Sequence, residues 1–255
     1  MLIDTHTHLY LDKFHEDIDD VMQRAKEAHV DLMLLPNIDL STMQDVLSLS
    51  KKYPSCLPMV GLHPCSVKNE YRSELEKLYP FLSSNKIIAV GEIGMDLYWD
   101  KTYKDEQVEA FHIQIDWALE NDLPIVIHSR NAMQECIDVV SERQNGNLRG
   151  VFHCFDQDET SARAIIDLGF YIGVGGVLTF KKSKLPAAIR DLPLDRIILE
   201  TDSPFLTPSP FRGKRNESSY VKYVAEKMAE IFDKEITEIA DITTANAKEL
   251  FRITS

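Results

Sequence analysis

Eight short apolar runs alternate with helical segments along the chain, and this alternation restricts its fold most strongly. The runs are residues 2–8, 31–36, 57–62, 86–92, 124–128, 150–153, 171–177 and 196–202. Apolar side chains at helical spacing predict the intervening helices at residues 16–29, 41–52, 70–82, 104–120, 133–143, 159–168 and 186–192, and two final helices at 219–232 and 235–251. Ser41 is the expected N-cap of the second helix. Runs that are short and almost wholly apolar indicate strands of a parallel sheet that is covered on both faces.

Strands that alternate with helices predict βαβ units. Eight such units in about 250 residues match the size of a (β/α)₈ barrel, or TIM barrel. The sequence therefore predicts an α/β protein in which residues 1–255 form a single TIM-barrel domain. A doubly wound open sheet is the alternative, but it usually has fewer strands and often a Gly-rich nucleotide-binding loop. No Gly-x-Gly-x-x-Gly follows the first run, and no Gly-x-x-x-x-Gly-Lys-Ser/Thr occurs in the sequence.

Charge and cysteine content restrict the partners and the compartment. The formal net charge is −13, which argues against broad electrostatic attraction to nucleic acid or to anionic lipid. A phosphodiester substrate would therefore have to be attracted locally, by bound cations and a small basic patch. No apolar run approaches the roughly 20 residues that a membrane-spanning helix needs, so we expect no membrane partner. The four cysteines form no Cys-x-x-Cys, and we expect reduced thiols in a cytoplasmic protein.

The first run ends in a His-Thr-His sequence. Side chains alternate faces along a strand, so His6 and His8 project to the same side. Imidazole is the commonest metal ligand among protein side chains. The pair could therefore hold one divalent cation, although a surface strand with two solvated histidines fits this stretch equally well.

Further candidate ligands follow the other runs. Each lies where a predicted strand ends, and TIM-barrel active sites lie at the carboxyl ends of the strands. In chain order these residues are His6, His8, His63, Glu92, His128, His153 and Asp202. Without His63, six strong candidate ligands remain. They are more than the four ligands of a tetrahedral zinc ion, and they suit two ions that share a carboxylate. Glu92 lies between the histidine groups and is the natural bridge.

Two simpler arrangements remain open. A single ion would use His6, His8, one of the two later histidines and Asp202. Without any ion, the same residues would form a hydrogen-bonded core network.

Seven sequence stretches resemble the TatD family of metal-dependent hydrolases within the amidohydrolase-type barrels. They appear in the order of the family and span positions 4 to 216. The stretches are Asp4-Thr5-His6-Thr7-His8, Gly61-Leu62-His63-Pro64, Gly91-Glu92-Ile93-Gly94-Met95-Asp96, Ile127-His128-Ser129-Arg130, His153-Cys154-Phe155, Glu200-Thr201-Asp202-Ser203-Pro204 and Arg212-Gly213-Lys214-Arg215-Asn216.

The resemblance implies a site for two divalent ions. It implies that His6, His8 and Asp202 hold one ion and that His128 and His153 hold the other. Glu92 would bridge the two ions, and Asp202 would also orient or deprotonate the attacking water. We therefore expect Asp202 and Glu92 to be the catalytic residues. The sequence does not distinguish magnesium, zinc, manganese or iron.

The resemblance also implies hydrolysis of DNA, often as a 3′-to-5′ exonuclease with magnesium, while some relatives are linked to deacylation of misacylated tRNA. This chain departs from the family pattern at Asn131, at Asp156-Gln157, at Ser218 and in the residues after Gly94. These positions follow predicted strands in loops around the mouth of the barrel. The departures therefore bear on the substrate and leave the predicted metal ligands intact.

Four residues are candidates for substrate binding. They are His63, Arg130, Arg212 and Lys214. The last two lie in the loop after the eighth run, where barrels often bind phosphate. Tyr98 and Trp99 could stack a base, or could equally pack into the core.

The sequence therefore predicts a metal-dependent hydrolase that cleaves phosphodiester bonds of DNA. The enzymatic alternative is a hydrolase of a small ester, amide or phosphoester, or of aminoacyl-tRNA. A metal-binding protein without catalysis is the alternative from another class. The expected partner is DNA or another phosphoester substrate, and the sequence indicates no obligatory protein partner.

Overall fold

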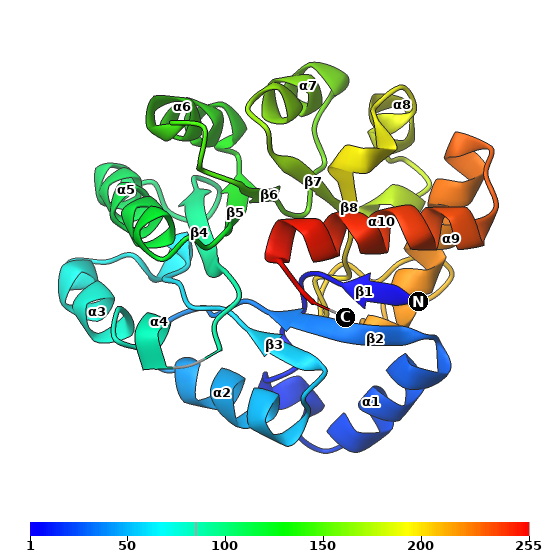
Figure 1. Ribbon diagram of the computed structural model, residues 1–255, viewed down its shortest axis with the longest axis horizontal. Helices are drawn as coiled ribbons and strands as arrows, with labels where there is room; N and C mark the ends of the chain where they lie inside the picture. Colours follow the sequence, from blue (N-terminus) through cyan, green and yellow to red (C-terminus); the bar gives the residue numbers. More distant parts are fainter. Residues whose placement is uncertain (85, 255) are drawn as a thin grey trace.

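Short parallel strands form the centre of the molecule (Figure 1). The computed structural model describes residues 1–84 and 86–254. The strands are β1 (Leu2–Asp4), β2 (Val30–Leu35), β3 (Cys56–Pro58), β4 (Val90–Asp96), β5 (Ile125–Arg130), β6 (Gly150–Phe152), β7 (Tyr171–Val174) and β8 (Ile197–Leu199). Strands β1–β3 pair in chain order, and so do β4–β8.

Single bridges join these two groups of strands into a ring. Val60, just after β3, forms a parallel bridge with Val90 at the start of β4. On the other side, Thr7 after β1 forms a parallel bridge with Ser203 after β8. The amide of Thr5 also donates to the carbonyl of Leu199 over 3.1 Å. The eight strands therefore close into a (β/α)₈ barrel, which confirms the predicted fold class.

Helices surround this ring of strands (Figure 1). They are α1 (Ile18–Glu27), α2 (Met43–Lys52), α3 (Tyr71–Leu78), α4 (Phe81–Ser84), α5 (Lys104–Glu120), α6 (Met133–Arg143), α7 (Glu159–Asp167), α8 (Leu185–Ile189), α9 (Val221–Phe232) and α10 (Ile236–Phe251). Short 3₁₀ helices occupy Asp12–Phe14, Pro64–Ser66, Gly176–Thr179, Leu194–Arg196 and Ser218–Tyr220. In the part of the chain that the structure describes, no helix is long and apolar enough to cross a membrane.

Several predicted boundaries are wrong, including those of the seventh and eighth strands, which end at Val174 and Leu199 rather than at residues 177 and 202. The helix predicted at 70–82 is two helices, α3 and α4, because Pro80 lies between them and a proline cannot continue helical hydrogen bonding. Thr42, not Ser41, is the N-cap of α2, and the carboxylate of Asp39 accepts the amide hydrogen atoms of both residues. Strand β4 begins at Val90 and continues beyond the predicted end at residue 92.

Apolar side chains fill the interior of the barrel at its amino-terminal end. Each strand, or the residues beside it, contributes one buried apolar side chain to a central cluster: Ile3, Leu34, Met59, Ala89, Val126, Val151, Tyr171 and Ile198. Helix α10 crosses this end of the barrel (Figure 1) and adds Ala247, Leu250 and Phe251 to the same cluster. A larger apolar cluster lies between the strands and the surrounding helices. The apolar plug leaves the carboxyl ends of the strands as the open end of the barrel.

Candidate metal centre

His6 and His8 lie directly beyond β1, and their Nε2 atoms are 3.3 Å apart. The Tyr10 hydroxyl donates its hydrogen to the carbonyl of Pro36 over 2.7 Å. Its oxygen therefore accepts a hydrogen bond from His8 Nδ1 over 2.8 Å. This arrangement leaves the Nε2 lone pair of His8 pointing at His6. The predicted same-sided projection of the two histidines is confirmed, and both side chains are buried.

Glu92 presents one carboxylate oxygen to each of two histidine groups. Its Oε2 atom lies 3.3 Å from His6 Nε2 and 3.6 Å from His8 Nε2. Its Oε1 atom lies 2.8 Å from His128 Nδ1 and 2.8 Å from His153 Nε2. Because Glu92 is not the last residue of β4, its expected place at the end of the strand is wrong. It lies where the pairing of β4 with β5 shifts register, and such bulges re-aim side chains beside active sites.

The surrounding imidazoles control the ionisation of Glu92. Burial alone disfavours its charged form, but His153, His63 and His6 outweigh burial and hold the pKa of Glu92 well below its usual value. Burial likewise disfavours protonated His153, yet Glu92 and Glu200 raise the pKa of His153 well above its usual value. Burial and the neighbouring His153 lower the pKa of His6. The site is therefore a buried anion among imidazoles, which is the electrostatic setting that a divalent cation completes.

Glu200 lies behind His153. The His153 ring stacks on that of His6 with centroids 3.8 Å apart, and its Nδ1 lies 3.5 Å from Glu200 Oε1. The same oxygen accepts the amide hydrogen of Cys154 over 2.6 Å. A Cβ atom at Gly173 would lie 2.4 Å from the other Glu200 oxygen, so glycine makes room for this buried carboxylate.

His128 is held between two carboxylates. Its Nδ1 contacts Glu92 as described, and its Nε2 lies 2.9 Å from Asp96 Oδ2. Gly94 permits this approach of β4 to β5, since its φ is +124° and a Cβ atom there would lie 2.2 Å from the His128 carbonyl oxygen. Asp96 was not among the predicted site residues. The available signal was the even spacing from Glu92, which places both side chains on one face of a strand.

Asp202 reaches the site through a tight turn after β8. Its backbone has a φ of +56°, a left-handed conformation that Asp tolerates better than most residues, and its amide donates to the His6 carbonyl over 2.9 Å. Its Oδ1 lies 3.5 Å from His8 Nε2 and 3.7 Å from His6 Nε2. Burial opposes ionisation, but hydrogen bonding to His8 and the charges of His6 and His153 lower the pKa of Asp202.

Three overlapping groups of these side chains could each hold a cation. The groups are His6, His153 and Asp202; His6, His8 and Glu92; and His63, Glu92 and His128. The donor set consists of imidazole nitrogen and carboxylate oxygen, which fits zinc, manganese or iron. His63, expected to contact substrate, lies 3.4 Å from Glu92 Oε1 and 3.3 Å from His128 Nδ1. It therefore belongs to the cluster itself as well as to the mouth of the barrel.

The contacts of the predicted basic residues are with aromatic rings and backbone rather than with the candidate ligands. Arg130 packs on Tyr98 and Trp99, and Arg212 lies over the Phe180 ring and donates to the Thr207 carbonyl. Lys214 is exposed. Within residues 1–84 and 86–254, Arg130, Arg212 and Lys214 form no ion pair.

Comparison with known proteins places the chain among metal-dependent hydrolases. The model of a family described as TatD related DNase matches residues 3–252. A metal-dependent hydrolase of Bacillus subtilis, YabD, named as uncharacterized, is 41% identical over 254 residues, with 99% of this chain and 100% of that protein covered. The 3′-5′ ssDNA/RNA exonuclease TatD of Salmonella typhimurium is 28% identical over 259 residues, with 99% of each chain covered. The crystal structure of YJJV, a TatD homologue of Escherichia coli, superposes with a TM-score of 0.94 at 30% identity, covering 99% of this chain and 98% of that one.

Proposed function

The chain belongs to the TatD family of metal-dependent hydrolases, and from this membership we propose that it hydrolyses phosphodiester bonds of nucleic acid, DNA foremost. The name of the Salmonella relative supports this substrate class. The observation that carries the proposal is the position of the Glu92 carboxylate, with one oxygen toward His6 and the other toward His128 and His153. A carboxylate shared by two ions requires one oxygen on each side in this way.

In this proposal His6, His8 and Asp202 would hold one divalent ion, and His128 and His153 would hold the second. Glu92 lies between the two groups and would be the shared ligand. The contact of His63 with Glu92 supports a place for it beside the second group. The bound ions would supply Lewis acidity at the phosphoryl oxygen and a bound water of lowered pKa.

The protein itself supplies a base and a scaffold for this chemistry. Asp202 is the proposed base because its side chain is 15% exposed, whereas that of Glu92 is 3% exposed. Its lowered pKa keeps it ionised at neutral pH, so it can accept a proton from the attacking water. Glu200 and Asp96 fix the ring orientations of His153 and His128. The free guanidinium of Arg130 and the exposed Arg212 and Lys214 are the proposed phosphate contacts.

The net charge of −13 favours a second candidate, a small ester, amide or phosphoester, and the alternative of aminoacyl-tRNA would use the same site. A small substrate needs no extended positive surface. The same metal centre would then polarise a carbonyl or a phosphoryl group.

We also propose that residues 1–255 form one domain and that the protein works in the cytoplasm. The continuous apolar cluster between strands and helices supports the first proposal. The free thiols of Cys56, Cys65, Cys136 and Cys154 support the second, because reducing compartments keep thiols in this state.

A substrate comparison tests the proposed function. The purified chain, reloaded in turn with magnesium, manganese and zinc, is given single-stranded DNA, duplex DNA, RNA, aminoacyl-tRNA and small esters. We expect shortening of 5′-labelled DNA from its 3′ end, and we expect Asp202→Asn to slow it on the order of 10³-fold. Asp167→Asn makes the same chemical change at an exposed position at the end of α7 and should leave the rate unaltered. Turnover of small esters with intact DNA and RNA would instead establish the second candidate.

A further inference from the structure

Two large aromatic rings are exposed beside the candidate metal centre. Tyr98 is 52% exposed and Trp99 is 69% exposed, and they lie in the loop just after β4, the strand that carries Glu92. Aromatic rings of this size are usually buried because burial removes a large apolar area from water. Exposed rings at the mouth of an active site are therefore surfaces on which a ligand can pack.

Arg130 adds a positive charge to these rings. Its guanidinium carbon lies 4.0 Å from the centroid of the Tyr98 ring and 5.1 Å from that of Trp99. Arg130 follows His128 by two residues on β5, so this cation lies beside the metal centre. The guanidinium of Arg130 forms no ion pair within the described residues, so its charge remains available to an anionic ligand.

Asp96 fixes the position of these rings relative to the metal centre. One carboxylate oxygen lies 2.9 Å from His128 Nε2. The other oxygen accepts the amide hydrogens of Tyr98 and Trp99 over 3.0 and 3.3 Å. A ligand that packs on the rings is therefore held at a defined place relative to His128.

A second ring and cation lie across the barrel. Phe205 is 44% exposed, and its centroid lies 6.2 Å from that of His8. The Lys13 ammonium lies 5.0 Å from the Phe205 ring. In a ring of eight strands, β8, which precedes Phe205, is four strands from β4 and faces it across the barrel. The metal centre thus lies between two pairs that each combine an aromatic face with a cation.

We propose that these two pairs bind unpaired nucleotides of a single-stranded nucleic acid that crosses the mouth of the barrel. Bases stack on Tyr98 and Trp99 at one side and on Phe205 at the other, while Arg130 and Lys13 contact the flanking phosphates. Aromatic stacking with a basic path is the usual means of holding single strands, and the base faces of a duplex are already occupied by neighbouring bases. The two cations also supply the local attraction that a net charge of −13 otherwise denies. This inference rests on the proposed function, which supplies the nucleic-acid substrate.

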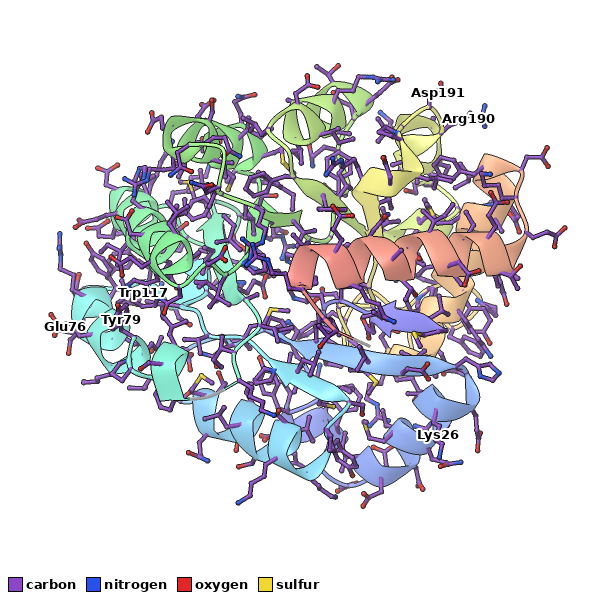
Figure 2. All side chains as sticks on the ribbon, viewed as in Figure 1. Lys26, Glu76, Tyr79, Trp117, Arg190 and Asp191 are labelled. Atoms are coloured by element: carbon purple, nitrogen blue, oxygen red, sulfur yellow. The ribbon has the colours of Figure 1, made fainter. Side chains whose placement is uncertain are left out.

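Tryptophan fluorescence provides a binding test that does not depend on turnover. The chain has two tryptophans, and Trp117 is 7% exposed and lies beside Tyr79 at the periphery of the molecule (Figure 2). In the Asp202→Asn protein, a single-stranded oligodeoxynucleotide should quench the emission of Trp99. The same strand with abasic residues should quench it far less. With Trp99→Phe added, the remaining Trp117 emission should not respond to either strand.

Kinetics provide the second test. Trp99→Ala should raise the KM for a single strand about 5-fold to 100-fold, the range found when a stacking side chain is removed. The parent protein should show a similar rise when the nucleotides beside the cleaved bond are abasic, and Trp99→Ala should add little to that rise. Tyr79→Ala removes another exposed aromatic side chain at the end of α3 and should leave the KM for both strands unaltered.

The outcomes separate this inference from the proposed function. Cleavage of single strands with no effect of Trp99→Ala, and no base-dependent quenching, would overturn the stacking surface and leave the nuclease proposal intact. Base-dependent quenching without cleavage of any strand would uphold the surface and overturn the nuclease proposal.

Discussion

The two ends of the barrel are built from opposite kinds of side chain. At the amino-terminal end, each strand contributes an apolar side chain to a plug that α10 seals with Leu250 and Phe251. At the carboxyl-terminal end, the chain continues from the same strands into buried histidines and carboxylates. Apolar burial stabilises the fold, whereas burying charge costs free energy unless partners or ions compensate it. The comparison predicts that changes at one end alter stability and that changes at the other alter chemistry.

Asp202→Asn is the sharpest test of the carboxyl-terminal end. The substitution keeps the size of the side chain but removes the proposed base. We expect the rate of hydrolysis to fall on the order of 10³-fold, within the range found for loss of general-base catalysis. The thermal midpoint of unfolding, measured by circular dichroism, should change little. A large fall in this midpoint with a normal rate would reverse the roles assigned to the two ends.

Phe251→Ala tests the amino-terminal end. The Phe251 side chain is buried in the plug, and its removal leaves a cavity that costs about 3–5 kcal/mol of unfolding free energy. Denaturant titration measures this loss, and kcat well below the melting range should match that of the parent. Phe232→Ala, at a partly buried position at the end of α9, is the matched control and should cost less. Equal losses from both variants would contradict a special role for the plug.

Glu200→Gln tests a carboxylate that touches the site only through His153. The variant keeps the volume that Gly173 and Gly175 accommodate but weakens the charge that orients the ring. Loss of such a supporting partner typically lowers metal affinity or activity about 10-fold to 100-fold. Metal titration of the apoprotein measures the affinity, and Glu235→Gln at an exposed position is the control. Unaltered affinity and rate would leave Glu200 with a role in stability alone.

The smallest expected effect comes from a charge pair at the reactive end that serves structure. Asp17 accepts hydrogen bonds from Arg215 over 2.7 and 2.6 Å, and Arg215 and Arg24 lower the pKa of Asp17 from its ordinary 3.8. The stability from this pair is present above pH 3.8 and declines as the pH falls through the lowered value. Asp17→Asn should therefore cost up to about 1 kcal/mol at pH 7 and less at an acidic pH at which Asp17 begins to bind a proton, as measured by urea unfolding. An equal difference at both pH values would show that charge is not the cause.

The sequence predicted the elements well where local pattern determines them. The bounds of α5 and α6 match the expected ranges, and the buried side chains of each helix recur three or four residues apart, as the helical period requires. The break at Pro80 was readable from the proline itself. The convergence of His6, His8, Glu92, His128, His153 and Asp202 followed from the rule that strand ends meet at one end of a barrel.

Contacts between distant segments could not be predicted. Arg215 belongs to a basic stretch expected to bind phosphate, yet it pairs with Asp17, 198 residues earlier in the chain. Likewise, the contact of Asp96 with His128 depends on the register of β4 against β5, which shifts at a bulge between Gly91 and Ile93.

Metal content tests the central claim most directly. That claim is that Glu92 joins two histidine groups into one binuclear site. We expect the full chain, saturated with manganese or zinc and freed of excess ion, to retain about two ions per molecule. Glu92→Gln should retain fewer while keeping the circular dichroism spectrum of the parent. A folded parent protein that retains no ion or a single ion, or a Glu92→Gln protein that retains two with parental affinity, would contradict the account.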